Sequence, residues 1–519
     1  MKKRRIYIGG LVLLTGIILI LNYITSLGYY KSPPSKIWSK EVIVGEGVVK
    51  NPAPILKDEE KVIVGYDDKD KLKISITDNV GKIIDEKAYD IDEDFIMGTS
   101  LCKSKDGYWF SFTSTKNSVG YMETLILDEN FNKKDSKKIE DVIEMKQLDD
   151  NLILICTSDK IEVINTKTEE IKALDEKGVS MLSAVKLKDK YLITFLEKQT
   201  NLKAILFENN QFNTAKNIKE LPKMQNVVYS NMACSADDKY GYILLEEETK
   251  GVFSGSKLIK YGLNNDEVDI SRLRVNNSEE IYYNKGFYSE KGARFLATTP
   301  RLFGKKDYQE NIIDYIINDG KVKEFSYVTR LRELCIYPYI NDDIASFVSF
   351  KNDKKFNINI ASTNEDFKKF NNESRKEEYS QALIATVQGI AYSFSYLFVL
   401  AIKWLIPVFV IGGIVSFFDY SFTKEKRAKS FIILACFAII AKCYAIITTV
   451  YGSYKMLLPQ FISNTIVGTI LCLIIGVLSY GLGYNFYKKD TEILTLIPLS
   501  LSLIIDSIIT LLIFVPYMT

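Results

Sequence analysis

The residues of this sequence with the clearest capacity for chemistry are charged side chains inside apolar segments. Lys403, Lys442 and Asp506 lie within such segments near the C-terminal end, and Asn464 lies close to the outer end of another. Charge inside a bilayer is costly and usually faces a bundle interior or a cavity. At about 1.5 Å per residue, the depths of the three charges agree to within roughly 5 Å. We therefore predict an intramembrane polar cluster that contains a Lys–Asp pair, with Asn464 at its rim.

Two interpretations of this cluster follow from the sequence. The functional one is an ion or substrate pathway, or a coupling point between a membrane bundle and an external domain. The structural one is that the polar groups hold the helices together, with Lys403 reaching partly toward the outer interface. The lone carboxylate and the lack of an evident inverted repeat argue against an autonomous transporter.

The absence of histidine restricts the chemistry further. It excludes Ser-His-Asp and Cys-His catalysis, histidine-containing zinc sites and the usual pH switch. The seven cysteines form no CxxC pair and are typical of buried small hydrophobic residues. Acidic clusters lack the spacing of a calcium loop, and no glycine-rich phosphate loop occurs. We predict no catalytic residue, no metal site and no cofactor, and the net charge of +2 gives no basis for a nucleic-acid partner.

Five apolar segments are long enough to cross a bilayer, which needs roughly 20 residues. The first, residues 6–28, is longer than the apolar core of a signal peptide, so we interpret it as a retained anchor. The others lie at roughly 395–418, 430–450, 461–486 and 492–517. The apolar stretch 381–395 is open to two interpretations, an interfacial helix or an extension of a tilted span.

Basic residues at the ends of these segments predict their orientation, because cytoplasmic flanks are enriched in lysine and arginine. If the chain crosses the membrane in alternating directions, three clusters of basic residues lie on the cytoplasmic side. They are Lys2, Lys3, Arg4 and Arg5; Lys424, Lys426, Arg427 and Lys429; and Lys488 and Lys489. The outer loop between the third and fourth spans carries only Lys455. The sequence therefore predicts a multi-pass cell-membrane protein with residues 30–380 and the C-terminal Thr519 outside the cytoplasm.

The long middle section contains an internal repeat. An acidic turn followed by an apolar strand recurs at Asp106, Asp150, Asp189, Asp238 and Asp343, with weaker copies at Glu60 and Gly292. The seven copies lie about 39 to 54 residues apart, and each is followed by a second alternating strand and a polar turn. Asn, Asp and Gly suit such turns because they tolerate the left-handed backbone conformation. The acidic positions are therefore expected to be structural.

Four short strands in a repeat of about 45 residues are typical of a propeller blade, and seven blades lie within the usual closure range. The turn–strand units resemble the DG-[YK]-hydrophobic hairpin of TolB-type and related propeller families, most clearly at SKDGYWFSF (104–112). This resemblance covers roughly residues 45–370 and implies a fold only. Residues 41–49 are predicted to close the ring beside residues 356–362. A pair of β-sandwiches, or six or eight blades, are the alternatives.

We therefore predict an all-β extracytoplasmic domain, a seven-bladed β-propeller, joined to an α-helical bundle with five transmembrane spans in total. The boundaries are an N-terminal anchor at 1–29, the propeller at 30–378, a juxtamembrane segment at 379–394 and a four-span membrane domain at 395–519.

The leading functional hypothesis is a membrane-anchored protein that binds or senses an extracytoplasmic ligand or protein. The lipid bilayer is a further partner, and a membrane protein is a candidate partner. Tyrosine-rich stretches at 281–290 and 334–343 are candidate contact surfaces, since tyrosine gives large contact area with little loss of entropy; cross-strand packing explains them equally well. One alternative is an accessory subunit of a transporter or envelope-assembly complex, in which Lys403, Lys442 and Asp506 form the contact to a partner. The other is a carboxylate-based ectoenzyme. The sequence favours binding over catalysis.

Overall fold

The computed structural model describes residues 2–93, 95–223, 225–303, 308–352, 354–489 and 493–518. The chain divides into a β unit, Pro33–Arg301 with Tyr308–Glu373, and a helical unit, Met1–Ser32 with Leu302–Asp307 and Ser374–Thr519. Thr519 and the side chains of Lys2, Lys3 and Arg4, which bear on the predicted orientation, lie outside the described residues.

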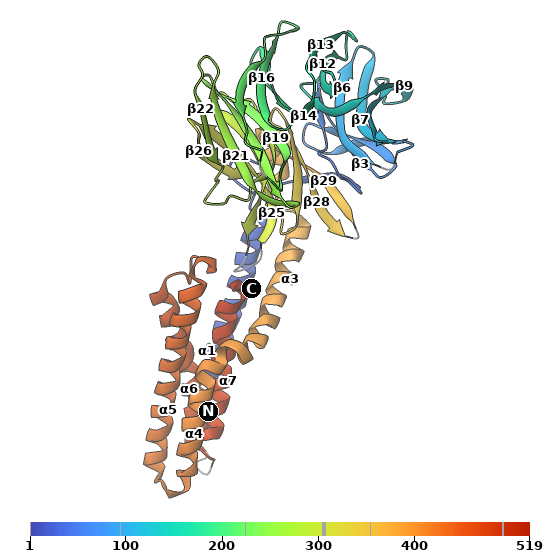
Figure 1. Cartoon of the computed structure of the whole chain (residues 1–519). Coiled ribbons are helices and arrows are strands. Elements are labelled where there is room, and N and C mark those ends of the chain that lie inside the picture. The colour runs from blue at the N-terminus through green and yellow to red at the C-terminus, as the bar shows by residue number, and fades with distance from the viewer. Residues whose placement is uncertain are drawn as a thin grey trace. The chain divides into compact units, whose positions relative to one another are not determined.

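The β unit is a seven-bladed β-propeller, as the repeat predicted (Figure 1). Blades 1 to 3 consist of β2 (Ile55–Asp58), β3 (Lys61–Asp68), β4 (Lys71–Asp78) and β5 (Ile83–Asp90); β6 (Ile96–Ser104), β7 (Gly107–Lys116), β8 (Val119–Leu127) and β9 (Lys133–Glu140); β10 (Val142–Gln147), β11 (Leu152–Thr157), β12 (Lys160–Asn165) and β13 (Ile171–Asp175). Blade 4 consists of β14 (Val179–Lys186), β15 (Lys190–Glu197), β16 (Asn201–Glu208), β17 (Gln211–Phe212) and β18 (Lys216–Glu220).

Blades 5 to 7 complete the ring. They consist of β19 (Val227–Ala236), β20 (Tyr240–Thr249), β21 (Val252–Gly262) and β22 (Val268–Arg272); β23 (Tyr282–Phe287), β24 (Ala293–Leu302), β25 (Tyr308–Asn318) and β26 (Lys321–Tyr327); β27 (Cys335–Asn341), β28 (Ile344–Asn352), β29 (Lys355–Ser362) and β1 (Val42–Gly47). β1 pairs antiparallel with β29, with Val42 opposite Ile360, so the predicted closing strand is confirmed.

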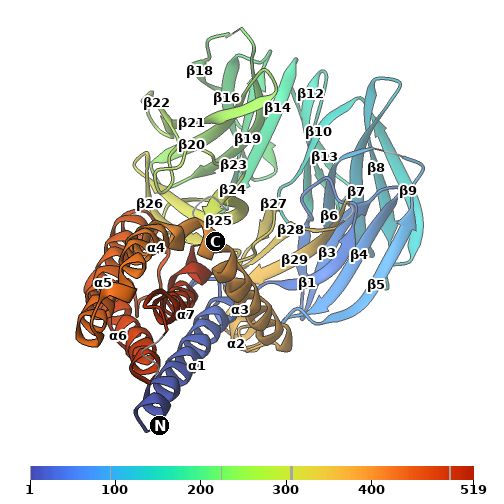
Figure 2. The same ribbon diagram turned by 90° about the horizontal axis from the view of Figure 1, so that it is seen from below.

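The innermost strands show that the ring is closed. In chain order β2, β6, β10, β14, β19, β23 and β27 each contact the next, and β27 contacts β2 again. Figure 2 shows the sheets following one another around a common centre. A closed ring leaves no large open sheet edge, which explains why an all-β domain of this size needs no further layer.

The order of strands in a blade follows from their composition. The second strands β3 and β7 are buried along nearly their whole length because neighbouring blades cover both of their faces. The outermost β9, KKDSKKIE, is almost fully exposed. Hydrophobic clusters such as Leu72, Ile74, Phe110 and Phe112 fill the space between blades.

The acidic turns of the repeat join the first and second strands of their blades. Asp106, Asp150, Asp189, Asp238 and Asp343 all lie in these turns, as do Glu60 and Gly292. Several turn carboxylates also tie one blade to the next. Asp343 of blade 7 pairs with Lys57 of blade 1 at 2.5 Å, and Asp58 of blade 1 accepts hydrogen bonds from Lys103 and Tyr108 of blade 2.

The chain enters and leaves the propeller at one place. Ser39 donates its backbone N–H to Ser362 at 2.9 Å, and Ser362 donates its own N–H back to the Ser39 hydroxyl, also at 2.9 Å. Because Ser362 ends β29 beside the start of β28, both segments lie at the face of the acidic turns. The short helix α2 (Glu365–Asn371), capped by Asn364, follows β29.

The helical unit contains five helices among the described residues that are long and apolar enough to cross a membrane. They are α1 (Lys2–Lys31); α3 (Lys376–Tyr396) continued by the π-helical turn η1 (Leu397–Ala401) and α4 (Ile402–Phe417); α5 (Lys424–Ala445) with η3 (Ile446–Tyr451); α6 (Thr465–Lys489); and α7 (Leu496–Phe514) with η5 (Val515–Tyr517). Short turns η2 (Asp419–Ser421) and η4 (Lys455–Leu457) complete the unit. The stretch 381–395 is thus a helix continuous with the second span.

The N-terminal helix is part of this bundle. α1 contacts α3, α6 and α7. The side chain of Asn22 donates a hydrogen bond to the Leu512 carbonyl at 2.9 Å and accepts one from Tyr517 at 2.6 Å. The prediction that all cysteines are buried is wrong for Cys436, which is exposed on α5, and for Cys443, which is half-buried. An apolar helix can present cysteine to lipid as readily as to its neighbours.

Candidate functional site

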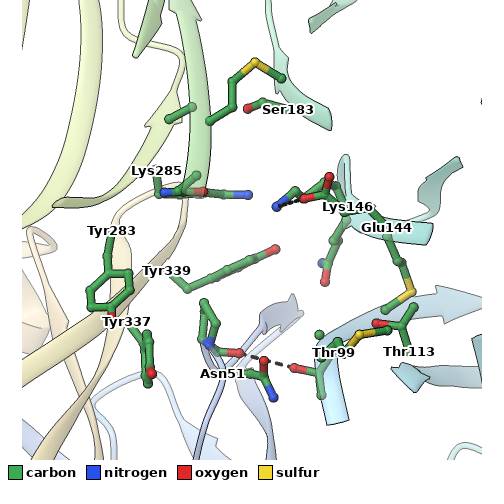
Figure 3. A pocket seen from close by; sticks show the side chains of 18 of the residues that line it. Asn51, Thr99, Thr113, Glu144, Lys146, Ser183, Tyr283, Lys285, Tyr337 and Tyr339 are labelled. Atoms are coloured by element: carbon green, nitrogen blue, oxygen red, sulfur yellow. Dashed lines mark hydrogen bonds and ion pairs between the residues drawn. The ribbon is translucent and has the colours of Figure 1, made fainter. Parts of the chain in front are cut away.

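A cavity of about 300 Å³ occupies the centre of the propeller. Its lining runs from the start of the innermost strands to their middle, as far as Lys285 and Tyr339, so most of it lies toward the face opposite the acidic turns. All seven blades or the segments that precede them contribute, among them Asn51, Thr99, Glu144, Lys146, Ser183, Asn231, Tyr283, Lys285, Tyr337 and Tyr339. Figure 3 labels these side chains, except Asn231, and shows that they converge on one space from strands distant in the sequence.

Bulges in the inner strands aim side chains into this cavity. β6, β10, β14, β19, β23 and β27 each gain one extra residue in their pairing with the second strand. A bulge breaks the strict alternation of a strand and re-aims the side chains beside it, and bulges occur often next to active sites. On β10 the bulge lies between Val142 and Glu144, directly before the residues that line the cavity.

Two tyrosines at these bulges adopt a left-handed backbone conformation. Tyr283 on β23 has φ 53° and Tyr337 on β27 has φ 57°. This conformation is rare for bulky residues and costs about 1–3 kcal/mol when the surrounding structure enforces it, usually at functional sites. The ring centroids of Tyr283 and Tyr337 lie 4.8 Å apart, and 37% of the Tyr283 surface is exposed. The fold therefore holds a pair of aromatic rings at the edge of the cavity.

A buried polar network supports the Tyr283 bulge from behind. Glu246 accepts hydrogen bonds from the backbone and side chain of Asn284 at 2.8 and 2.9 Å and from Asn231 at 2.8 Å. Tyr315 donates to the Asn284 side-chain oxygen at 2.6 Å. Burial raises the pKa of Glu246. Every member of the network is buried or half-buried. The network is therefore shielded from solvent and holds the backbone at the bulge in place.

Two lysines face each other across the cavity from blades 3 and 6 (Figure 3). Lys146 pairs with Glu144 at 2.7 Å, and the second oxygen of Glu144 accepts the backbone N–H of Leu182 at 2.7 Å. Lys285 has no hydrogen-bond or ion-pair partner among the described residues; its ammonium lies 5.1 Å from the ring centroid of Tyr339. Burial and the charge of Lys146 lower the pKa of Lys285 to about 8.

The opposite end of the channel carries charges of both signs. A second cavity of about 370 Å³ is lined by Asp149, Asp150 and Asp342 and by Lys186 and Lys188, and it shares Gln147, Lys285 and Tyr339 with the first. Asp150 accepts a hydrogen bond from Asn341 at 2.9 Å, and burial raises the pKa of this carboxyl. Carboxylates and lysines thus balance each other at the turn end, whereas lysines outnumber carboxylates in the central cavity.

The helical unit brings together two of the four residues predicted for the polar cluster. Lys442 and Asp506 form an ion pair at 2.6 Å, with both side chains fully buried, and Lys442 also donates to the Cys472 carbonyl at 2.8 Å. Lys403 is exposed and bonds Thr449 at 2.8 Å. Asn464 caps the start of α6 by accepting the N–H of Ile466 at 2.9 Å.

These positions bear on the hypothesis that the cluster contacts a membrane partner. Lys442 and Asp506 engage each other inside the bundle, so their side chains offer no surface to another protein. Lys403 is exposed and thus accessible to a partner or to lipid.

The channel residues were not singled out individually by the sequence, although one signal pointed toward them. The two tyrosine-rich stretches chosen as contact surfaces contain Tyr283, Lys285, Tyr337 and Tyr339, all of which line the cavity. Lys146 and Glu144 carry no comparable signal, because VIEMKQL reads as an ordinary alternating strand.

Comparisons with known proteins add no assignment. No protein-family model matches this chain, and no curated protein matches it. Among the described residues, no group of three or more His, Cys, Asp or Glu side chains is placed to hold a metal ion.

Proposed function

We propose that this protein is a membrane-anchored extracytoplasmic binding or sensing protein whose propeller channel receives a ligand. The observation that carries the proposal is the central cavity, where two conformationally strained tyrosines converge with Lys285, for which the described residues supply no hydrogen-bond or ion-pair partner. Ligand sites are concave, with a few placed polar groups among apolar walls, and strain of this kind is usually retained for function. The apolar helices supply the anchor.

The extracytoplasmic position of the propeller rests on the distribution of basic residues. Lys424, Lys426 and Lys429 begin α5, and Lys488 and Lys489 end α6, whereas the turn between α5 and α6 carries only Lys455. Cytoplasmic ends are enriched in lysine and arginine. The C-terminal end of α1 and the N-terminal end of α3 lead into the propeller. With this orientation, both of these ends lie outside the cytoplasm.

Labelling of single introduced cysteines tests this orientation. We expect Asn117→Cys, in the exposed β7–β8 hairpin, to react with a membrane-impermeant maleimide in intact cells, and Lys426→Cys at the start of α5 to react only after lysis. The unsubstituted protein gives the background from its native cysteines. Labelling of Lys426→Cys but not Asn117→Cys in intact cells would contradict the proposed orientation.

Blocking the cavity tests the binding site. Thr99 on β6 lines the cavity and makes a single side-chain hydrogen bond, to the Pro52 carbonyl at 3.2 Å. Replacing it with tryptophan fills the space at small cost to the fold. In a thermal-shift screen of the detergent-purified full chain against small metabolites, we expect compounds that stabilise the wild type and have no effect on Thr99→Trp.

The matched control is Thr115→Trp on the exposed end of β7, outside the cavity. This variant should respond to each compound as the wild type does. If no compound stabilises the wild type, or if every active compound stabilises Thr99→Trp equally, the channel is not the binding site.

A further inference from the structure

We propose that the ligand of the channel is a small organic anion, whose carboxylate or phosphate group lies between Lys285 and Lys146 and whose ring packs on Tyr283 and Tyr337. This inference rests on the proposed function and names the class of ligand for that site. It follows from the charges, the hydrogen bonds and the ring positions around the cavity.

The charges that line the cavity are unequal. Three lysines, Lys50, Lys146 and Lys285, face one carboxylate, Glu144. Glu144 is already engaged by Lys146 and by the backbone of Leu182, so it is not available to neutralise Lys285 across the channel. A cation half-buried without a counterion is unfavourable, and an anion between the two ammonium groups would satisfy both.

A neutral donor beside the lysines suits the same group. Figure 3 shows the Tyr339 hydroxyl directed into the space between Lys285 and Lys146. A carboxylate or phosphate presents several acceptor oxygens and accepts hydrogen bonds from lysine and tyrosine together.

The tyrosine pair indicates what the anion carries. Tyr283 and Tyr337 present adjacent rings at the edge of a cavity of about 300 Å³, which is the lower end of the size of small-molecule sites. Aromatic rings prefer offset or edge-on contact with other rings and bury much apolar area. A ligand with one aromatic or similarly flat group fits both the rings and the volume.

Titration of Lys285 gives the expected pH dependence. The groups that face it are Lys146 and Glu144 from β10, Cys234 from β19 and Tyr339 from β27. Burial raises the pKa of the Cys234 thiol and the Tyr339 hydroxyl, so both remain neutral near pH 8. An anion binds the charged form of Lys285, and its affinity should therefore fall as pH rises through about 8, by about tenfold between pH 7 and pH 9.

The test uses calorimetric titration of the full chain in detergent with four probes: benzoate, phenyl phosphate, acetate and neutral benzamide. We expect benzoate or phenyl phosphate to bind in the millimolar range or tighter, and about tenfold or more tighter than both acetate and benzamide. The two aromatic anions distinguish a carboxylate ligand from a phosphate ligand. Lys285→Met should weaken the better probe at least about tenfold, whereas Lys285→Arg should retain binding.

Lys116→Met, on the exposed end of β7, is the control and should leave the affinity unchanged. The thermal midpoint of each variant shows whether it is folded, and Lys285→Arg separates loss of charge from loss of packing. Failure of both aromatic anions to bind overturns the proposal, as does binding that Lys285→Met leaves unchanged. Acetate binding as tightly as benzoate overturns the role of the tyrosines.

These outcomes are separable from failure of the proposed function. If the metabolite screen yields compounds that Thr99→Trp blocks, but all of them are neutral or cationic and insensitive to Lys285→Met, the channel binds a ligand and the anion assignment is wrong. If the screen yields none, the binding site itself is refuted.

Discussion

Replacing Asp506 with leucine is expected to destabilise the helical unit by about 3–5 kcal/mol, because Lys442 then remains buried without a counterion. In the structure the two side chains are fully buried and meet at 2.6 Å. The Cys472 carbonyl, which accepts a second hydrogen bond from Lys442, cannot replace a charge. Uncompensated charge within a membrane helix is among the most costly substitutions.

The double variant Lys442→Met/Asp506→Leu is the informative control. A buried ion pair replaced by apolar groups of similar volume is often neutral or stabilising, since neither ion then has to be desolvated. We therefore expect the double variant to recover most of the stability that each single variant loses. The wild type, the two single variants and the double variant form a double-mutant cycle. Thermal unfolding in detergent, monitored by size-exclusion chromatography, measures the stability of all four proteins.

Two results would contradict this account. A single Asp506→Leu variant as stable as the wild type would show that the pair contributes nothing. A double variant no better than the single ones would show that packing, and not charge, holds the helices at this place. Full recovery of stability together with normal ligand binding by the double variant would identify the pair as structural.

Replacing Trp38 with alanine is expected to destabilise the propeller by about 3–5 kcal/mol, the usual cost of deleting a large core side chain. Trp38 lies ahead of β1 yet is fully buried in a cluster with Leu296, Val328 and Phe347 from blades 6 and 7. Its indole donates a hydrogen bond to Asp314 at 2.9 Å. Loss of the ring would leave a cavity where the entering chain joins the last two blades.

The expected shift in the midpoint of thermal unfolding is about 4–7 °C, given the entropy of unfolding of a unit of this size. Trp38→Phe should lose less, about 1–2 kcal/mol, because the ring is largely kept and Asp314 retains its pair with Arg294. Equal destabilisation by Phe and Ala would show that the hydrogen bond dominates. No effect of Trp38→Ala would show that the entering segment does not help to close the ring.

The propeller and the helical unit are stabilised in different ways. In the propeller, seven interfaces between blades hold the ring together, and Asp58, at the end of the innermost strand β2, bonds Lys103 and Tyr108 of the next blade. The cavity is the place where this regularity is broken, through bulges and left-handed tyrosines. Departures from local preference that the rest of a fold must support are expected at functional sites. The cavity is thus the strongest candidate for function in the described residues.

Local patterns in the sequence were sufficient for the architecture. Turn residues such as Asp106 and Gly107 mark hairpins by their own backbone preferences; Gly107, at φ 140°, has no room for a side chain because a Cβ would meet the Leu127 carbonyl at 2.2 Å. Seven such turns at similar spacing predict seven blades, and apolar length predicts the membrane helices. The fixed rise of a helix was likewise enough to bring Lys442 and Asp506 to one depth.

The direction in which a side chain points around the helix axis, and the local path of the chain, could not be predicted from these patterns. Lys403 lies just after the π-helical turn η1, which changes the direction in which the following residues point, and it faces outward to Thr449. Equal depth therefore did not imply contact. Asn464 precedes α6, and its side chain is used by the first turn of that helix.

The sequence by itself determined the repeat, the closing strand and the apolar helices, because each depends on residues close together in the chain. Only the tertiary structure decided the site. Lys146 and Lys285 are 139 positions apart and meet because closure of the ring sets blade 3 across from blade 6. The direction in which the side chains of Lys146 and Lys285 point depends on bulges that shift the strand register by one residue. Such a shift turns side chains to the other face of a strand. The charge that distinguishes the channel thus arises from long-range geometry rather than from any local motif.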